Sequence, residues 1–255
     1  RYFEIMNTRG QQLEQVDIVK ARLMSYLAGA DMEDARECFA WIWDACADME
    51  TYIQLALTRG DTKLRTTIFG KTWDSLVDFT FGSLLLHRRE TGLAQETAPL
   101  GSATLSDAIE RYSNLGSGEA RDDLASERFE SPIRFPNLLL QTLLTMRRSD
   151  SEHGSKDDSS LDDSRLIKLF ETEFESLDAA SKNDRTRLFA ESLLCAKFTL
   201  DNYVLKREFT STNGSDGAWS LRRLVKSTSE GKRNATYVNS YGRNSEHDDD
   251  EALVS

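Results

Sequence analysis

Hydrophobic side chains recur every three or four residues along several stretches of this chain, and this spacing constrains the fold more than any other feature. The clearest case is Cys38–Leu57. Because an α-helix has 3.6 residues per turn, the spacing places its apolar residues on one stripe of a helix. We therefore predict one long amphipathic helix that ends at Gly60, since glycine favours helix ends. The stripe consists of Phe39, Ile42, Trp43, Cys46, Met49, Ile53 and Leu57.

Other stretches predict further helices, and strand signals are few. Val16–Leu27 repeats the apolar spacing, Ser106 or Thr104 suits a helix N-cap, and Pro136 suits the first turn of a helix. The predicted helices are Val16–Leu27, Thr104–Tyr112, Pro136–Arg147 and Asp184–Phe209, and the short strand candidates are Arg1–Met6 and Thr236–Tyr241.

Three polar stretches separate these elements. Ser149–Ser164 is almost entirely polar and predicts a linker, while Ser117–Glu130 and Thr210–Gly217 predict loops. We expect a mostly α fold of two helical lobes joined by the linker. The predicted core includes Phe135, Leu139, Leu143, Phe189, Leu193, Phe198 and Tyr203.

Composition limits the classes of protein that the chain can represent. No apolar run reaches the roughly 18–20 residues needed to span a bilayer, so no membrane partner is expected. The three cysteines form no CxxC pair, which argues against a disulfide framework and favours a reducing, cytoplasmic compartment. The net charge of −11 disfavours a general nucleic-acid binder, including a nucleocapsid-like RNA binder. Leu221–Arg233 is the best local basic stretch, and its favoured interpretation is a solvated face.

Catalytic constellations are not apparent. The histidines, His87, His153 and His247, have no second His or Cys at metal-ligand spacing. Five aspartates could each act as an acid or a base, but helix caps and solvated faces are the simpler interpretation of each. They are Asp44, Asp48, Asp162, Asp163 and Asp201. Lys206-Arg207-Glu208 either contacts DNA or forms a surface ion pair, and the surface ion pair is the favoured interpretation.

The turn Asn7-Thr8-Arg9-Gly10 before the first helix is the best candidate site. Gly10 permits a positive φ and close approach of the backbone to a ligand, and the following helix start offers free N–H groups. Asn7 can donate and accept hydrogen bonds, and Arg9 can form a forked contact with a phosphate. These residues could form a wall of a nucleotide phosphate site, although such turns are also common as purely structural features.

Several stretches in succession resemble the GmrSD-type restriction proteins of bacteria and archaea, which have a ParB/sulfiredoxin-like N-terminal domain. The stretches are FEIMNTRGQQLEQVDIVKARLMSYL, FAWIWDACADMETYIQ, IRFPNLLLQTLL, LLCAKFTLDNYVLKREF and DGAWSL. Phe3, Asn7, Gly10 and Leu13 match the family pattern Phe-x-x-x-Asn-x-x-Gly-x-x-Leu, and by that match Asn7 would line the nucleotide pocket. The ligand role of Arg9 is a chemical inference only.

The resemblance implies an internal fragment, because neither the upstream Asp-Gly-Gln-Gln-Arg motif nor an HNH-type nuclease region is present. The resemblance divides the chain into four parts. The end of the nucleotide-binding domain would be residues 1–28, and a helical region would cover 29–148. The polar linker would be 149–164, and a second helical region with a frayed C-terminus would cover 165–255. The parent would bind a nucleoside triphosphate with a divalent metal and cleave DNA, often modified phage DNA. A second copy of the same protein, in a homo-oligomer, is a further possible partner. The hypothesis is an anti-phage protein whose helical region couples nucleotide binding to DNA cleavage. The alternative is a non-catalytic helical interaction module.

Overall fold

A computed structural model describes residues 15–90, 128–150, 165–209, 217–227 and 234–241. The described part of the first helix covers residues 15–26. The further helices are α2 (Met32–Ala47), α3 (Ile53–Thr58), α4 (Thr62–Phe69), α5 (Phe81–Glu90), α7 (Phe135–Asp150), α8 (Leu166–Phe174) and α9 (Ala179–Tyr203). The strands are β1 (Arg128–Glu130), β2 (Lys206–Phe209), β3 (Ala218–Ser220), β4 (Arg222–Lys226) and β5 (Ala235–Asn239). The predicted mostly α fold class is confirmed.

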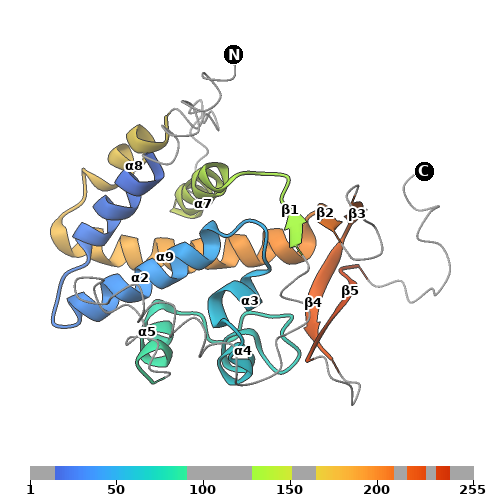
Figure 1. Cartoon of the computed structure of the whole chain (residues 1–255). Coiled ribbons are helices and arrows are strands. Elements are labelled where there is room, and N and C mark those ends of the chain that lie inside the picture. The colour runs from blue at the N-terminus through green and yellow to red at the C-terminus, as the bar shows by residue number, and fades with distance from the viewer. Residues whose placement is uncertain (1–14, 91–127, 151–164, 210–216, 228–233, 242–255) are drawn as a thin grey trace, which may run out of the picture.

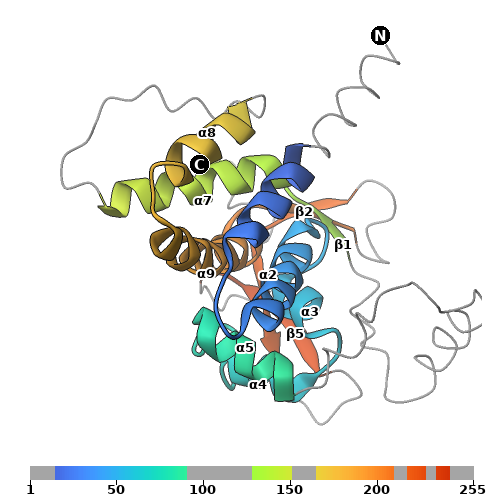
Figure 2. The ribbon, with the colours of Figure 1, turned by 90° about the vertical axis from the view of Figure 1, so that its left-hand side faces the viewer.

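Helix α9 runs through the middle of the molecule, and the other helices pack around it (Figure 1). Helices α7 and α8 lie on one side of α9, and α3, α4 and α5 lie on the other, which the view down α9 also shows (Figure 2). The strands gather at the C-terminal end of α9. This arrangement makes α9 the element that joins the helices to the strands.

The strands form two small antiparallel sheets. One has the order β1-β2-β3, and the other is the β4-β5 pair. In the first sheet Glu130 pairs with Arg207, and Arg207 pairs with Trp219. In the second sheet Leu224 pairs with Tyr237.

The described helices share one hydrophobic core. Six of the predicted core residues are buried, and Tyr203 is partly buried against the same cluster. Because Leu139 and Leu143 of α7 belong to the same buried cluster as Phe189 and Leu193 of α9, residues on both sides of the predicted linker contribute to one core. Among the described residues, no helix combines the length and the hydrophobicity needed to cross a membrane.

The predicted helix over Cys38–Leu57 is two helices in the structure, so that boundary was wrong. Helix α2 ends at Ala47, where Asp48 has extended backbone geometry and its side chain accepts a hydrogen bond from Glu50 N at 3.1 Å. Such local side-chain bonds compete with helix continuation. Helix α3 then starts at Ile53. The predicted apolar residues within the two helices are buried, whereas Met49 lies between the helices and is partly buried.

The predicted helix over Asp184–Phe209 also differs from the structure. Helix α9 starts earlier, at Ala179, where the Asp178 side chain accepts a hydrogen bond from Ser181 N at 2.8 Å. It ends at Tyr203, and the KREF stretch forms β2 because β1 and β3 supply hydrogen-bonding partners on both sides. Pairing between segments distant in sequence is not encoded in local periodicity.

The remaining predictions had mixed outcomes. The helices over Val16–Leu27 and Pro136–Arg147 and a strand near Thr236–Tyr241 are confirmed. The predicted loop over Ser117–Glu130 was wrong at its end, which forms β1, and β3 and β4 were not predicted. The predicted elements at Arg1–Met6 and Thr104–Tyr112 lie outside the described residues, as does the predicted linker except for its first two residues, which belong to α7.

Candidate functional site

The helix over residues 15–26 is the described element nearest in sequence to the candidate nucleotide turn. Asn7, Arg9 and Gly10 themselves lie outside the described residues. The apolar stripe of the helix, Val16, Val19, Leu23 and Leu27, is buried as predicted. The segment that follows the turn is therefore anchored in the core.

Polar contacts fix this helix to α2 and α8. Lys20 Nζ lies 2.6 Å from Asp44 Oδ1 of α2, and Arg22 Nη1 lies 2.5 Å from Glu171 Oε1 of α8. Tyr26 stacks on Phe174 of α8 with ring centroids 5.7 Å apart. The pKa of Arg22 is raised, chiefly by its hydrogen bond to Glu171.

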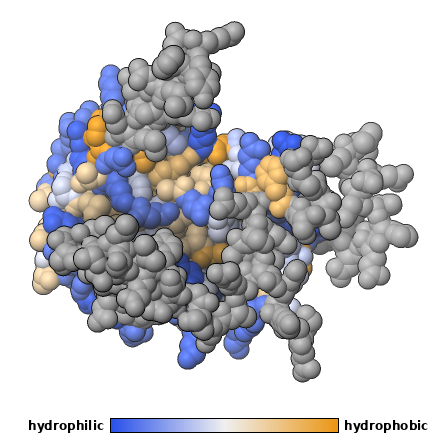
Figure 3. All heavy atoms as spheres, viewed as in Figure 1, coloured by the Kyte–Doolittle hydropathy of each residue, from blue (hydrophilic) through white to orange (hydrophobic). Residues whose placement is uncertain are grey.

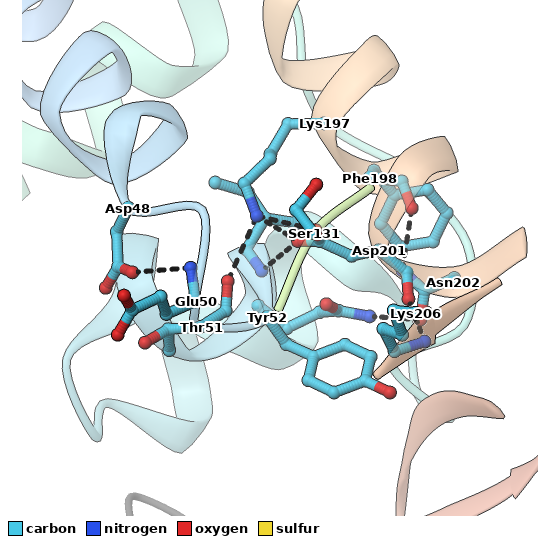
Figure 4. Close-up of polar contacts among 12 residues, drawn as sticks. Asp48, Glu50, Thr51, Tyr52, Ser131, Lys197, Phe198, Asp201, Asn202 and Lys206 are labelled. Carbon is cyan, nitrogen blue, oxygen red and sulfur yellow. Dashed lines mark hydrogen bonds and ion pairs between the residues drawn. The ribbon is translucent and has the colours of Figure 1, made fainter. Parts of the chain in front are cut away.

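A second polar cluster lies where α9 meets α3 and the strands, and sequence analysis missed it (Figure 4). At its centre Lys197 and Asp201, one turn apart on α9, have fully buried side chains. Lys197 Nζ lies 2.5 and 2.7 Å from the two carboxylate oxygens of Asp201 and donates to the Thr51 carbonyl at 3.1 Å. Asp201 Oδ2 also accepts from Ile53 N at 2.7 Å, which satisfies a free N–H group at the start of α3.

Burial governs the electrostatics of this pair. Removal from water raises the pKa of the Asp201 carboxyl, and the Lys197 ammonium opposes that change. Because the carboxylate is hydrogen-bonded to two donors inside the protein, the arrangement is that of a structural joint between α9 and α3.

Lys206 and Glu208 extend the cluster toward the strands, so the prediction of a surface ion pair at Lys206-Arg207-Glu208 was wrong. Lys206 is 1% exposed and Glu208 is 8% exposed. Lys206 Nζ donates to the carbonyl oxygens of Asp201 at 2.7 Å and Arg222 at 2.6 Å. Strand alternation turns these two residues inward and leaves Arg207 on the outer face.

The environment of Lys206 changes its acidity. Burial lowers the pKa of Lys206 from 10.5 to about 8, although the Glu208 carboxylate acts in the opposite direction. The Tyr52 hydroxyl lies 3.0 Å from both Glu208 Oε1 and the Arg222 carbonyl oxygen, and burial is the main cause that raises the pKa of Tyr52. These groups hold β2 and β4 against the residues that precede α3.

Asn202 completes the joint on the side of the second sheet. Its Oδ1 accepts from Gln54 Nε2 at 3.1 Å and from Leu224 N at 3.2 Å. Its Nδ2 donates to the Phe198 carbonyl at 2.8 Å, and its backbone carbonyl accepts from the Ser240 hydroxyl. One amide side chain thus connects α9, α3 and β4.

A surface cavity of about 880 Å³ lies beside this cluster, at the β1 end of the three-stranded sheet. Its wall includes Glu50, Phe129, Glu130, Arg134 and Phe209. Aromatic rings and charged groups of both signs can accommodate a planar polar ligand.

The structure does not bring the other sequence candidates into one site. Asp44 is in the ion pair with Lys20, Asp48 accepts a local backbone hydrogen bond, and His87 Nε2 lies 2.8 Å from Asp78 Oδ2. Hydrogen bonds from Ser83 and then His87 lower the pKa of Asp78. The part of the chain that the structure describes contains no group of three or more His, Cys, Asp or Glu residues that could hold a metal ion. His153, His247, Asp162 and Asp163 lie outside it.

In comparisons with known proteins, no family model, no curated protein and no solved structure matches this chain.

Proposed function

We propose that the chain is part of a GmrSD-like, modification-dependent restriction protein, in which the helical region couples nucleoside triphosphate binding to DNA cleavage. The ordered family-like stretches motivate the proposal. The observation that carries the coupling role is the anchoring of the helix over residues 15–26, whose described part begins five residues after Gly10 of the candidate nucleotide turn.

The contacts of this helix give the coupling a physical route. A change in the turn at Asn7–Gly10 would act on a helix whose apolar face is buried and whose polar groups contact both α2 and α8. Packed helices move as discrete units because cores are close-packed and resist continuous deformation. Displacement of this helix would therefore be passed to α8 rather than absorbed locally.

Nucleotide binding is the first test, made on the full-length protein that contains this chain. Calorimetry and phosphate release are measured with ATP, GTP, CTP and UTP in the presence of Mg²⁺. We expect Asn7→Ala to weaken binding at least tenfold, because an amide that lines the pocket is lost. Thr8→Ala is the matched control from the same turn, at a position outside the family pattern, and it should bind as the wild type does. Equal binding by Asn7→Ala would make the turn structural.

The coupling role needs a separate test, with nucleotide-stimulated cleavage of modified DNA as the readout. Arg22→Glu should keep nucleotide binding and lose stimulated cleavage, because it places a carboxylate against Glu171 on α8. The double variant with Glu171→Arg restores opposite charges and should regain stimulation. If Arg22→Glu cleaves like the wild type, this contact does not carry the coupling.

The alternative is a non-catalytic helical interaction module, and one observation favours it. Asp201, the most buried of the three described candidate acids or bases (Asp44, Asp48 and Asp201), is fully engaged by Lys197 and by Ile53 N. Its role in the structure is therefore architectural. A folded wild-type protein that binds none of the four triphosphates would favour this alternative.

A further inference from the structure

The outer face of the β1-β2-β3 sheet carries an exposed aromatic and cationic group. The register aligns Glu130, Arg207 and Trp219 across the three strands, and Phe209 lies two residues beyond Arg207 on the same face. Trp219 is 59% exposed, whereas Trp41, Trp43 and Trp73 are all buried. A tryptophan ring combines a large apolar area with an N–H donor, which is why tryptophan is enriched at interfaces.

The neighbours of Trp219 on this face, Arg207 and Phe209, pack against each other. The Arg207 guanidinium carbon lies 5.6 Å from the centroid of the Phe209 ring. Gly217 has a φ of +60°, and a Cβ there would lie 2.9 Å from Phe209 Cε1 and 3.1 Å from Arg207 Cγ. The glycine therefore lets the backbone pack closely against the Phe209 ring and the Arg207 side chain, which fixes the position of both.

The strand region also differs in charge from the rest of the chain. Apart from β1, whose Glu130 is exposed, the described residues 206–209, 217–227 and 234–241 of this region contain one acidic residue, Glu208, which is buried. The same residues contain five basic ones, Lys206, Arg207, Arg222, Arg223 and Lys226, within a chain of net charge −11. Lys226 is exposed, and Arg223 keeps 30% of its side chain exposed although its Nη1 lies 3.8 Å from Asp74 Oδ2. This local excess of positive charge complements a polyanion.

We propose that the sheet face formed by Trp219, Arg207 and Phe209 is a stacking platform for unpaired bases of single-stranded DNA, with the cations of β4 attracting its phosphates. Aromatic and guanidinium planes bind bases with little sequence preference, because every base has a π face. Duplex DNA hides those faces in its base stack. The cavity beside Phe209 and Glu130 gives room for a base turned out of the strand. The inference rests on the proposed function only in taking DNA as the partner.

The arrangement of tryptophans supplies a direct measurement on the full-length protein. Trp219 is the exposed tryptophan of this chain, so a base stacked on it should quench part of the emission, and the same titration of Trp219→Phe identifies that part. The probes are a labelled oligothymidine strand, a duplex of equal length and an RNA strand of equal length, each titrated at several salt concentrations. We expect the single-stranded DNA to quench tryptophan emission and to bind at least tenfold more tightly than the duplex.

Variants separate stacking from charge. Trp219→Ala and Arg207→Ala should each weaken binding of the oligothymidine strand about tenfold in fluorescence anisotropy, and Trp219→Phe should retain binding but lose the quenching. Glu130→Gln should tighten binding, because it removes a carboxylate 4.0 Å from Arg207 Nη1. Leu86→Ala and Arg89→Ala on α5 are the matched controls for an exposed apolar and an exposed cationic residue, and they should bind as the wild type does.

The proposal would be overturned by wild-type affinity in Trp219→Ala, by equal or tighter binding of the duplex, or by tighter binding of RNA than of DNA. Absence of binding to any strand would overturn it as well. Because these measurements contain no triphosphate, they are independent of the test on Asn7, so failure of the platform and failure of the nucleotide site are distinguishable.

Discussion

At the scale of single residues, the charged side chains near the end of α9 have a structural role, because they are buried and hydrogen-bonded rather than exposed to solvent. Lys197 and Asp201 obey the i,i+4 spacing of an ordinary exposed helix pair, yet both have no exposed side-chain area. Their hydrogen bonds to Thr51 and Ile53 explain why both charges are tolerated in the interior.

Breaking this pair should be costly. Asp201→Asn is expected to destabilise the protein by about 3–5 kcal/mol, because it leaves the Lys197 ammonium buried without its counterion. Asp44→Asn is the matched control, since Asp44 is 59% exposed and its ion pair with Lys20 should contribute no more than about 1 kcal/mol. Urea denaturation measures both, and equal effects of the two substitutions would contradict a structural role for the buried pair.

Lys206 predicts a specific dependence of stability on pH. Its pKa is about 8 in the folded protein against 10.5 for the ordinary side chain. Between those values the unfolded chain holds the proton and the folded chain does not, so the contribution of Lys206 to stability rises with pH. Below pH 8 both states are protonated and this contribution is constant.

The measurement is the free energy of unfolding of the wild type minus that of Lys206→Met, from pH 7 to 10.5. One pKa unit corresponds to about 1.4 kcal/mol, so the difference should rise by up to about 3 kcal/mol above pH 8. Lys63→Met, at an exposed position of α4, is the control. It measures how the loss of an exposed lysine changes the free energy of unfolding over the same pH range. A difference for Lys206→Met that falls with pH would contradict the assigned environment.

At the scale of elements, several boundaries depend on contacts between distant segments. The start of α3 is stabilised by Asp201 of α9, and residues of β2 pair with residues of β1 that lie 77 to 81 positions earlier in the chain. Helix α4, by contrast, has a local N-cap, since Asp61 accepts from the backbone N–H groups of Lys63 and Leu64 at 2.9 Å. Local capping signals can be read from sequence, and distant partners cannot.

The connection into β3 should be sensitive to one substitution. Gly217→Ala is expected to destabilise the protein by about 1–3 kcal/mol, because alanine disfavours the positive φ and its Cβ would contact Phe209. Gly82→Ala in α5 is the control, since a Cβ there meets nothing within 4 Å and alanine favours a helix. Thermal unfolding should show a lower Tm for the first variant and an unchanged or higher Tm for the second. A higher Tm for Gly217→Ala would contradict the described turn.

At the scale of the whole molecule, the shared core decides how the helices behave together. Hydrophilic residues cover much of the described surface, and apolar residues reach it in a band across the middle of the viewed face (Figure 3). Beneath that surface, α9 contacts α2, α3, α5, α7 and β4. Such a central helix favours a single cooperative unit.

Cooperative unfolding can be tested with matched substitutions on the two sides of the predicted linker. Leu57→Ala in α3 and Leu193→Ala in α9 each remove a fully or almost fully buried side chain, at a cost of about 2–5 kcal/mol. Both should shift the same transition, with coincident curves from circular dichroism and tryptophan fluorescence. Two separate transitions, each shifted by one variant only, would instead support independent lobes.

The sequence by itself determined the helical class, the apolar stripes and most of the core, because these follow from a local period of 3.6 residues. Phe189 and Leu193 illustrate this, since their burial follows from position on one helix face. The tertiary structure alone decided that KREF is a strand, that Asp201 supports the start of α3 and that Lys206 is buried. Each of those outcomes depends on a partner distant in sequence, and a lysine or aspartate has the same local signature whether its partner is water or a buried carbonyl.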